Sequence, residues 1–178
     1  MTTNSPSTAA PLTGVKVLDL TRLLPGPLCG QYLSDLGAEV IKIEDTGAGD
    51  YARPAVRRLV NRGKQAIRLN LKTNQGKEIF HKLAKDADII LESFRPGTMQ
   101  RLGLGYEDLC PLNPRLVYCA ISGYGQTGPR RAQAGHDINF LALSGVLSQT
   151  GTEDQPVIPG FLIGDLAGGT LSAVSGIL

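Results

Sequence analysis

The chain is predicted to fold as an α/β protein with an open, mostly parallel, Rossmann-like sheet flanked by helices. Short apolar runs, typical of strands buried on both faces, alternate with segments that have helical spacing. Glycine and proline separate these segments, as at Pro25-Gly26-Pro27 and at Gly37. The alternation indicates β-α-β units, whose strands run parallel because a helix crosses between them.

The first β-α-β unit is predicted near the start of the chain. Residues 15–20 form the first apolar run, and residues 28–36 have helical spacing that ends at Gly37, a typical C-terminal cap. The preceding Pro-Gly-Pro break suits a first helical turn. Residues 39–44 form the second strand. Residues 45–65 are polar, contain glycine and are predicted to be irregular.

The rest of the chain continues the alternation. Further strands are predicted at 66–71, 88–92 and 116–121. Helices are predicted at 73–85 (with Thr73 as its N-cap), 97–102, 106–112 and 137–147, and again from Asp165. Ligands of such sheets bind beyond the carboxyl ends of the strands. We therefore expect three loops to form one crevice: residues 21–27, 44–50 and 93–97.

Composition narrows the class of protein. Of the 178 residues, 42% are hydrophobic and 19% charged, which is typical of a globular protein and argues against disorder. The formal net charge of +2 does not by itself favour nucleic-acid binding. No apolar run reaches the roughly 20 residues that span a bilayer. Residues 1–11 lack the pattern of a secretory signal and are predicted to be a flexible tail before one domain at 12–178.

Metal and nucleotide motifs find little support. Cys29, Cys110 and Cys119 are odd in number and lack metal-ligand spacing, and His81 and His136 are the two histidines. We expect three reduced thiols in a cytoplasmic protein and no metal site. No GxGxxG follows the first strand and no GxxxxGK[ST] occurs, so the usual nicotinamide and P-loop interpretations lose their main evidence.

Two glycine-flanked motifs contain residues suited to proton transfer, Gly135-His136-Asp137 and Gly164-Asp165. An imidazole and a carboxylate can share this task at neutral pH. A lone histidine is more often structural, and Asp137 and Asp165 can each be a helix cap. A helix dipole would lower the pKa of Asp165, although the same helix start would support a negative oxygen on a substrate. The residues alone leave the structural and catalytic roles open.

Basic and glycine residues offer further candidates for ligand contacts. Arg95 and Arg101 flank the start of a predicted helix, where a guanidinium and free N–H groups suit phosphate, although a solvated loop explains them equally well. The basic stretch at 53–68 favours a solvated face. Gly168 and Gly169 indicate close approach either of a ligand or of another helix.

An ordered series of motifs resembles the N-terminal half of the family III CoA-transferase and α-methylacyl-CoA racemase superfamily (CaiB/BaiF-type). Their order and number carry the resemblance, which covers nearly the whole chain after Pro11. The motifs lie at 18–21, 25–27, 36–44, 49–50, 92–97, 113–116, 121–129, 135–139 and 164–165.

The resemblance implies an acyl-CoA thioester ligand, with coenzyme A as part of the substrate and no tightly bound cofactor. The positions that match the CoA-lining positions of relatives are Leu23, Leu69, Ser93, Phe94, Arg95 and Arg101. Asp45 stands where several relatives have a basic residue. The resemblance also implies that the final helices lead to a linker and a second domain. Assembly would be a homodimer of interlocked chains or a complex with a complementary C-terminal half, without nucleic acid or membrane.

The resemblance includes two reactions. Racemases use a histidine and an aspartate on opposite faces of the α-carbon, through an enolate, whereas transferases use an aspartate nucleophile that forms acyl intermediates. Asp165 fits both, and His136 resembles the racemase branch. Leu24 stands where some transferases have a functional glutamine. We favour a racemase, with a CoA transferase and an inactive CoA-binding fragment as alternatives. If nothing covers them, four apolar residues should face solvent: Leu171, Val174, Ile177 and Leu178.

Overall fold

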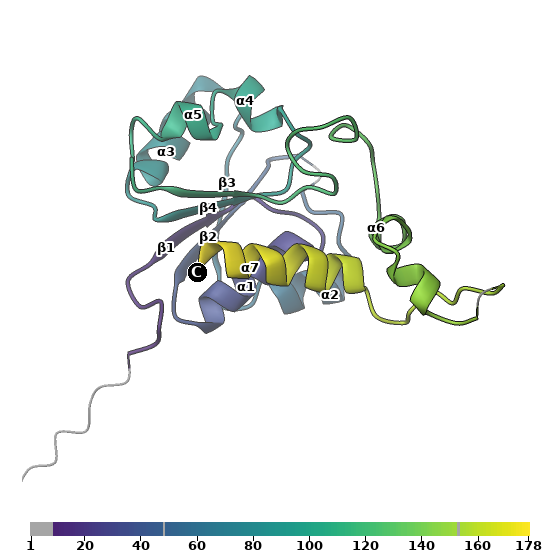
Figure 1. Cartoon of the computed structure of the whole chain (residues 1–178). Helices are drawn as coiled ribbons and strands as arrows, with labels where there is room; N and C mark the ends of the chain where they lie inside the picture. The colour runs from purple at the N-terminus through teal and green to yellow at the C-terminus, as the bar shows by residue number, and fades with distance from the viewer. Residues whose placement is uncertain (1–8, 48, 153) are drawn as a thin grey trace, which may run out of the picture.

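A five-stranded parallel sheet forms the centre of the computed structural model, which describes residues 9–47, 49–152 and 154–178 (Figure 1). The strand order is β3-β2-β1-β4-β5. The strands are β1 (Lys16–Asp19), β2 (Glu39–Glu44), β3 (Gln65–Arg68), β4 (Ile89–Glu92) and β5 (Val117–Ala120). The predicted open, parallel α/β sheet is confirmed. The predicted N-terminal tail falls mostly on residues 1–8, outside the described residues.

Helices cover both faces of the sheet (Figure 1). One face carries α1 (Pro25–Asp35), α2 (Pro54–Val60) and α7 (Ser172–Ile177), and the other carries α3 (Asn74–Lys85), α4 (Thr98–Leu102) and α5 (Tyr106–Leu109). Beside the sheet lie α6 (Asp137–Leu143) and the 3-10 helix η1 (Val146–Gln149). The π-helical segment η2 (Gly164–Leu171) packs against α1 and leads into α7. Within the described parts of the chain, no helix has both the length and the apolar character needed to cross a membrane.

Two hydrophobic cores lie on either side of the sheet because successive strand residues point to opposite faces. Leu18 and Ile90 face the first core, where they meet the fully buried Phe80 of α3. Val17 faces the second core and packs with Leu33 of α1. Since both faces of the central strands are covered, β4 (Ile89–Glu92) is buried along its whole length and has a continuous apolar run rather than an alternating one.

Local signals in the sequence correctly marked both ends of α1 and the start of α3. Pro25 is the first residue of α1. Gly37 follows α1 with a φ of +100°, and its N–H donates to the Ser34 carbonyl at 2.9 Å. Thr73 Oγ1 accepts from the Gly76 N–H at 3.1 Å and caps α3, as predicted.

Two predictions about secondary structure were wrong. The stretch at 45–65, predicted to be irregular, contains α2, which begins at Pro54 and packs beside α1. The helix predicted at 137–147 ends at Leu143, because Gly145 adopts a φ of +81° and a separate 3-10 turn follows. In both cases the polar or small residues of the segment gave no clear helical period.

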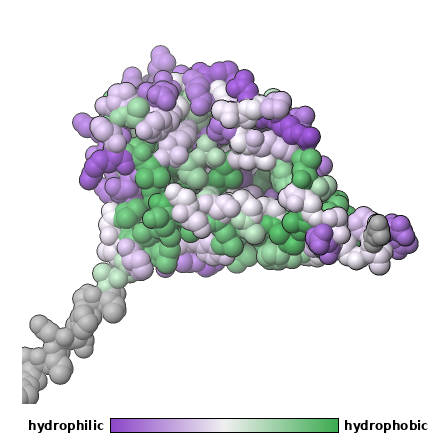
Figure 2. Space-filling model, viewed as in Figure 1, coloured by the Kyte–Doolittle hydropathy of each residue, from purple (hydrophilic) through white to green (hydrophobic). Residues whose placement is uncertain are grey.

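The final helix is only partly exposed. Leu171 and Leu178 are 50% and 67% exposed, as expected. Val174 and Ile177 instead pack against the core on the α1 side, so the prediction that they face solvent was wrong. Figure 2 shows hydrophobic residues gathered on the side of the molecule where α1 and α7 lie.

A buried carboxylate, Asp19, ends β1 and is neutralised by two lysines. The Lys64 ammonium lies 2.8 Å from one carboxylate oxygen, and the Lys42 ammonium lies 3.3 Å from the other. Burial raises the pKa of Asp19, but the two ammonium groups and the hydrogen bonds from Lys64 and Thr21 outweigh burial and hold that pKa below its usual value. Gly30 of α1 leaves room for the pair, since a Cβ there would lie 2.8 Å from the Asp19 carboxylate.

Replacement of this carboxylate is expected to destabilise the fold. Asp19→Asn leaves two buried ammonium groups without a counter-charge and should lower the free energy of unfolding by about 3–5 kcal/mol. Urea unfolding of the variant and the wild type measures the loss. Asp35→Asn is the matched control: Asp35 pairs with Arg62 at the surface, 2.6 Å apart, and the change should cost about 1 kcal/mol or less. Equal losses in the two variants would contradict a structural role for the buried cluster.

Candidate functional site

The three loops predicted to share a crevice meet at the carboxyl edge of the sheet. The Arg22 N–H donates to Ser93 Oγ at 2.9 Å, and the Leu23 N–H donates to Asp50 Oδ1 at 3.0 Å. The Arg22 side chain also forms an ion pair with Asp45. These contacts join the first loop to the second and third loops, so the three loops meet as predicted.

Arg22 lies where the three loops meet, although it was not among the predicted site residues. Besides its ion pair with Asp45, its guanidinium lies 5.9 Å from the ring centroid of Tyr51 and 5.4 Å from that of Phe94. Both distances suit a cation-π interaction. The position of Arg22 in the sequence could have indicated its role. It lies in the loop after the first strand, and loops at the carboxyl ends of strands in such sheets bind ligands.

The other predicted CoA-lining residues have different surroundings. Leu23 is 45% exposed, whereas Leu69, just after β3, is buried in the core that Phe94 also contacts. Arg95 is exposed in the loop after β4, and Arg101 on α4 donates to Thr98 Oγ1 at 3.0 Å. The three loops thus bring Leu23, Ser93 and Phe94 close to Arg22, and the two arginines lie at the solvent side.

Glu92, at the end of β4, is a second residue that the sequence did not single out. It is buried, and its carboxylate accepts from the Phe94 N–H at 2.7 Å. Burial raises the pKa of Glu92 to about 7, although this hydrogen bond opposes the shift. Burial and then the charge of Glu92 also raise the pKa of Tyr118 on β5, whose hydroxyl is buried and has no hydrogen-bond partner among the described residues.

The two proton-transfer candidates lie at neighbouring helix starts. His136 precedes α6, and its backbone N–H donates to Asn139 Oδ1 at 2.9 Å. Asp137 is buried, and instead of capping its own helix it accepts from the Asp165 N–H at 2.8 Å. Asp137 therefore ties the start of η2 to the start of α6, and with it Asp165 to the neighbourhood of His136.

The pKa of Asp165 shifts in the direction opposite to the one expected from a helix dipole. Burial, followed by the negative charge of Asp137, raises it, and His136 opposes this rise. Asp165 is only half-buried, so water and ligand can still reach its carboxylate. A carboxyl group with a raised pKa is better suited to accept and return a proton near neutral pH.

The glycines of η2 have different explanations. A Cβ at Gly169 would lie 2.8 Å from the Cβ of Pro25, and Thr170 Oγ1 donates to the Pro25 carbonyl at 2.9 Å. Close packing of η2 against α1 therefore explains Gly169. Gly168 has no heavy atom within 4 Å of the position of a Cβ, so this position is open to a neighbour or ligand.

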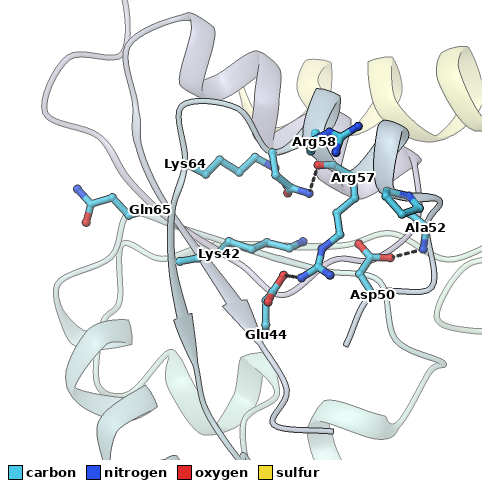
Figure 3. A pocket seen from close by; sticks show the side chains of 11 residues that line it. Lys42, Glu44, Asp50, Ala52, Arg57, Arg58, Lys64 and Gln65 are labelled. Carbon is cyan, nitrogen blue, oxygen red and sulfur yellow. Dashed lines mark hydrogen bonds and ion pairs between the residues drawn. The ribbon is translucent and has the colours of Figure 1, made fainter. Parts of the chain in front are cut away.

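A cavity of about 640 Å³ lies between α2 and strands β2 and β3, next to the crevice (Figure 3). Its basic residues are largely paired: Arg57 with Glu44, and Lys64 with the buried Asp19. The interpretation of the stretch at 53–68 as a solvated face was therefore wrong for Lys64, whose side chain is 1% exposed.

The described residues offer no metal centre. None of them forms a group of three or more histidine, cysteine, aspartate or glutamate side chains that could hold a metal ion. Cys29, Cys110 and Cys119 are free thiols, and burial raises the pKa of Cys29 to about 12. Such a thiol is a poor nucleophile because its thiolate is not populated at neutral pH.

Comparison with known proteins places the chain in a family. The family model described as CoA-transferase family III matches residues 12–178. The chain belongs to CoA-transferase family III. Members of the family that resemble it include both transferases and racemases: it is 46% identical to succinyl-CoA:glutarate CoA-transferase of Mus musculus, over 89% of this chain and 39% of that protein. It is 45% identical to alpha-methylacyl-CoA racemase of Homo sapiens, over 94% of this chain and 43% of that protein.

A solved family structure supports the same fold. A CAIB/BAIF family protein from Brucella suis superposes with a TM-score of 0.88 at 38% identity, over 95% of this chain and 48% of that one. The chain thus spans less than half the length of each of these relatives. The predicted superfamily, and the likeness to one half of its members, are confirmed.

Glu92 should make stability depend on pH. The folded chain holds its proton to about pH 7, whereas an unfolded chain releases it near the ordinary pKa of 4.5. The free energy of unfolding should therefore fall as the pH rises from about 4.5 to about 7, and stay lower above that range. Glu92→Gln keeps an acceptor for Phe94 and removes the charge, so relative to wild type it should gain about 2–3 kcal/mol between pH 5 and pH 8.

Urea unfolding at both pH values measures this difference. Glu78→Gln, at an exposed position on α3, is the control and should show no such gain. The same stability difference between Glu92→Gln and wild type at pH 5 and pH 8 would contradict the burial of an ionisable carboxylate at this position.

Proposed function

We propose that this chain is the CoA-binding and proton-transfer half of an acyl-CoA racemase or epimerase. The observation that carries the proposal is the link from Asp137 to the Asp165 N–H, at 2.8 Å, which ties Asp165 to the helix that begins after His136. An imidazole and a carboxyl group with a raised pKa form a suitable acid-base pair for the α-carbon of a thioester.

The proposed reaction needs one group on each face of the α-carbon. One of His136 and Asp165 removes the α-proton, which leaves an enolate on the thioester, and the other returns a proton to the opposite face. The roles exchange for the opposite stereoisomer. The influence of His136 on the pKa of Asp165 supports this pairing, because it requires the imidazole to lie near the carboxyl group.

The crevice at the carboxyl edge of the sheet is proposed to hold the CoA portion. The proposed contacts are the predicted residues Leu23, Leu69, Ser93, Phe94, Arg95 and Arg101, with Arg22 added at the centre. Guanidinium groups suit the phosphates of CoA, and the exposed ring of Tyr51 and the partly buried ring of Phe94 offer apolar surface near Arg22. In this proposal coenzyme A arrives as part of the substrate, and no other cofactor is used.

We also propose that the active protein is a cytoplasmic homodimer, or a complex of this chain with a complementary C-terminal half. Leu171, the last residue of η2, and Leu178, which follows α7, are both exposed. They support an interface at this helix, because apolar side chains are more stable when a partner covers them. An acyl-CoA thioester is the proposed small-molecule partner.

A CoA transferase is the second candidate function. A succinyl-CoA:glutarate CoA-transferase and an alpha-methylacyl-CoA racemase are similar to this chain to almost the same degree, at 46% and 45% identity. In this alternative Asp165 is the nucleophile and forms acyl intermediates, and His136 has no part in proton transfer. Hydroxylamine trapping of an acyl group on Asp165 during turnover would support the transferase, and a clean negative result would count against it.

Exchange of the substrate α-proton in heavy water tests the racemase. The protein expressed from its complete gene should exchange the α-proton of a 2-methylacyl-CoA, measured by NMR. His136→Ala and Asp165→Asn should each slow exchange by about 10²-fold or more. The other histidine provides a control: His81→Ala, on α3, should exchange at the wild-type rate. No exchange by the wild type, or equal exchange by wild type and both site variants, would overturn the proposal.

A further inference from the structure

Leu23 has an unusual backbone conformation for its residue type. Its φ is +68°, and it is the only non-glycine residue with a positive φ among the described residues. A leucine side chain disfavours this left-handed region, and such a conformation persists only where the surroundings hold it. Leu23 lies between Arg22 and the start of α1, so its conformation sets the direction of the first loop.

Asp50 supplies the contact that holds Leu23. One of its carboxylate oxygens accepts from the Leu23 N–H at 3.0 Å and from the Ala52 N–H at 2.9 Å, the second of which Figure 3 shows. This oxygen thus holds the loop that contains Asp50. It also holds the first loop, 27 positions earlier in the sequence. The other oxygen is buried without a hydrogen-bond partner in the described part of the chain. A buried oxygen without a hydrogen bond lowers the stability of the fold, so this loop conformation is held at some cost in free energy.

The backbone conformation of Leu23 also affects the position of Arg22. Arg22 precedes Leu23, its backbone N–H bonds to Ser93, and its guanidinium lies over the rings of Tyr51 and Phe94. A change of φ at Leu23 would rotate the peptide that joins it to Arg22 and disturb these contacts. The position of the Arg22 guanidinium is therefore linked to the Asp50 carboxylate through the backbone of Leu23. No hydrogen bond or ion pair joins the two side chains in the described residues.

We propose that Asp50 is a positioning residue, which holds Leu23 in the left-handed conformation and so keeps the first loop ready to bind CoA. The inference rests on the proposed CoA site. Asp50 acts through the backbone of Leu23, and it need not touch the ligand.

Calorimetric titration of the purified protein with CoA tests this role. Asp50→Ala should weaken CoA binding by about tenfold, because the loop is no longer held. Asp50→Asn keeps an acceptor oxygen and should bind within about threefold of wild type. Asp88→Ala is the matched control: Asp88 also accepts a backbone N–H, that of Lys16 at 2.9 Å, but at the opposite edge of the sheet, and its loss should leave affinity unchanged.

A second substitution separates positioning from general destabilisation. Glycine adopts a positive φ without strain, so in a Leu23→Gly background the Asp50→Ala change should weaken CoA binding by about threefold or less, rather than tenfold. Equal losses in both backgrounds would contradict the proposed link. Crystal structures of wild type and Asp50→Ala test the geometry directly, since the variant should lose the positive φ at Leu23.

The outcomes distinguish the two proposals. If wild type does not bind CoA, the proposed CoA site is wrong, and the φ of Leu23 in the two crystal structures still decides whether Asp50 holds the loop. If wild type binds CoA and Asp50→Ala binds equally well, or keeps its positive φ, the role of Asp50 is wrong while the CoA site stands.

Discussion

The buried Asp19 carboxylate is the constraint on which the first half of the sheet depends. A charge removed from water must be paired within the fold, and the two ammonium groups that pair it come from β2 and from the turn before β3. Lys64 also donates to the Pro27 carbonyl at the start of α1, 2.7 Å away. One cluster therefore fixes the relative positions of three strands and the first helix. Its carboxylate, Asp19, is the last residue of β1 and lies just before the first site loop.

Carboxylates repeat this task around the site. Asp50 holds Leu23, Glu92 holds Phe94, and Asp137 holds Asp165, in each case by accepting a backbone N–H. Loops positioned in this way are organised before a ligand arrives, which lowers the entropy cost of binding. Arg22 is fixed from two sides. Its own N–H donates to Ser93, and the N–H of the next residue, Leu23, donates to Asp50.

Proteins named for two different reactions share the fold of this chain. A transferase and a racemase resemble this chain to almost the same degree, so the sheet and the loops at its carboxyl edge are compatible with both. The two proposed reactions differ in how Asp165 and His136 are used. The position of His136 beside Asp165 is therefore more informative about chemistry than the fold is.

Periodicity and turn residues were enough to predict the five parallel strands, most helices and the meeting of three loops, because these follow from local steric rules and from the geometry of parallel sheets. The motif at His136 and the one at Asp165 were also recognisable in the sequence. Nothing local indicated that Lys64 is buried or that Asp50 bonds to Leu23, since each contact joins residues more than 20 positions apart. Burial likewise reversed the expected pKa shift of Asp165, because desolvation and the charge of a neighbour are properties of packing, which arises only when distant segments fold together.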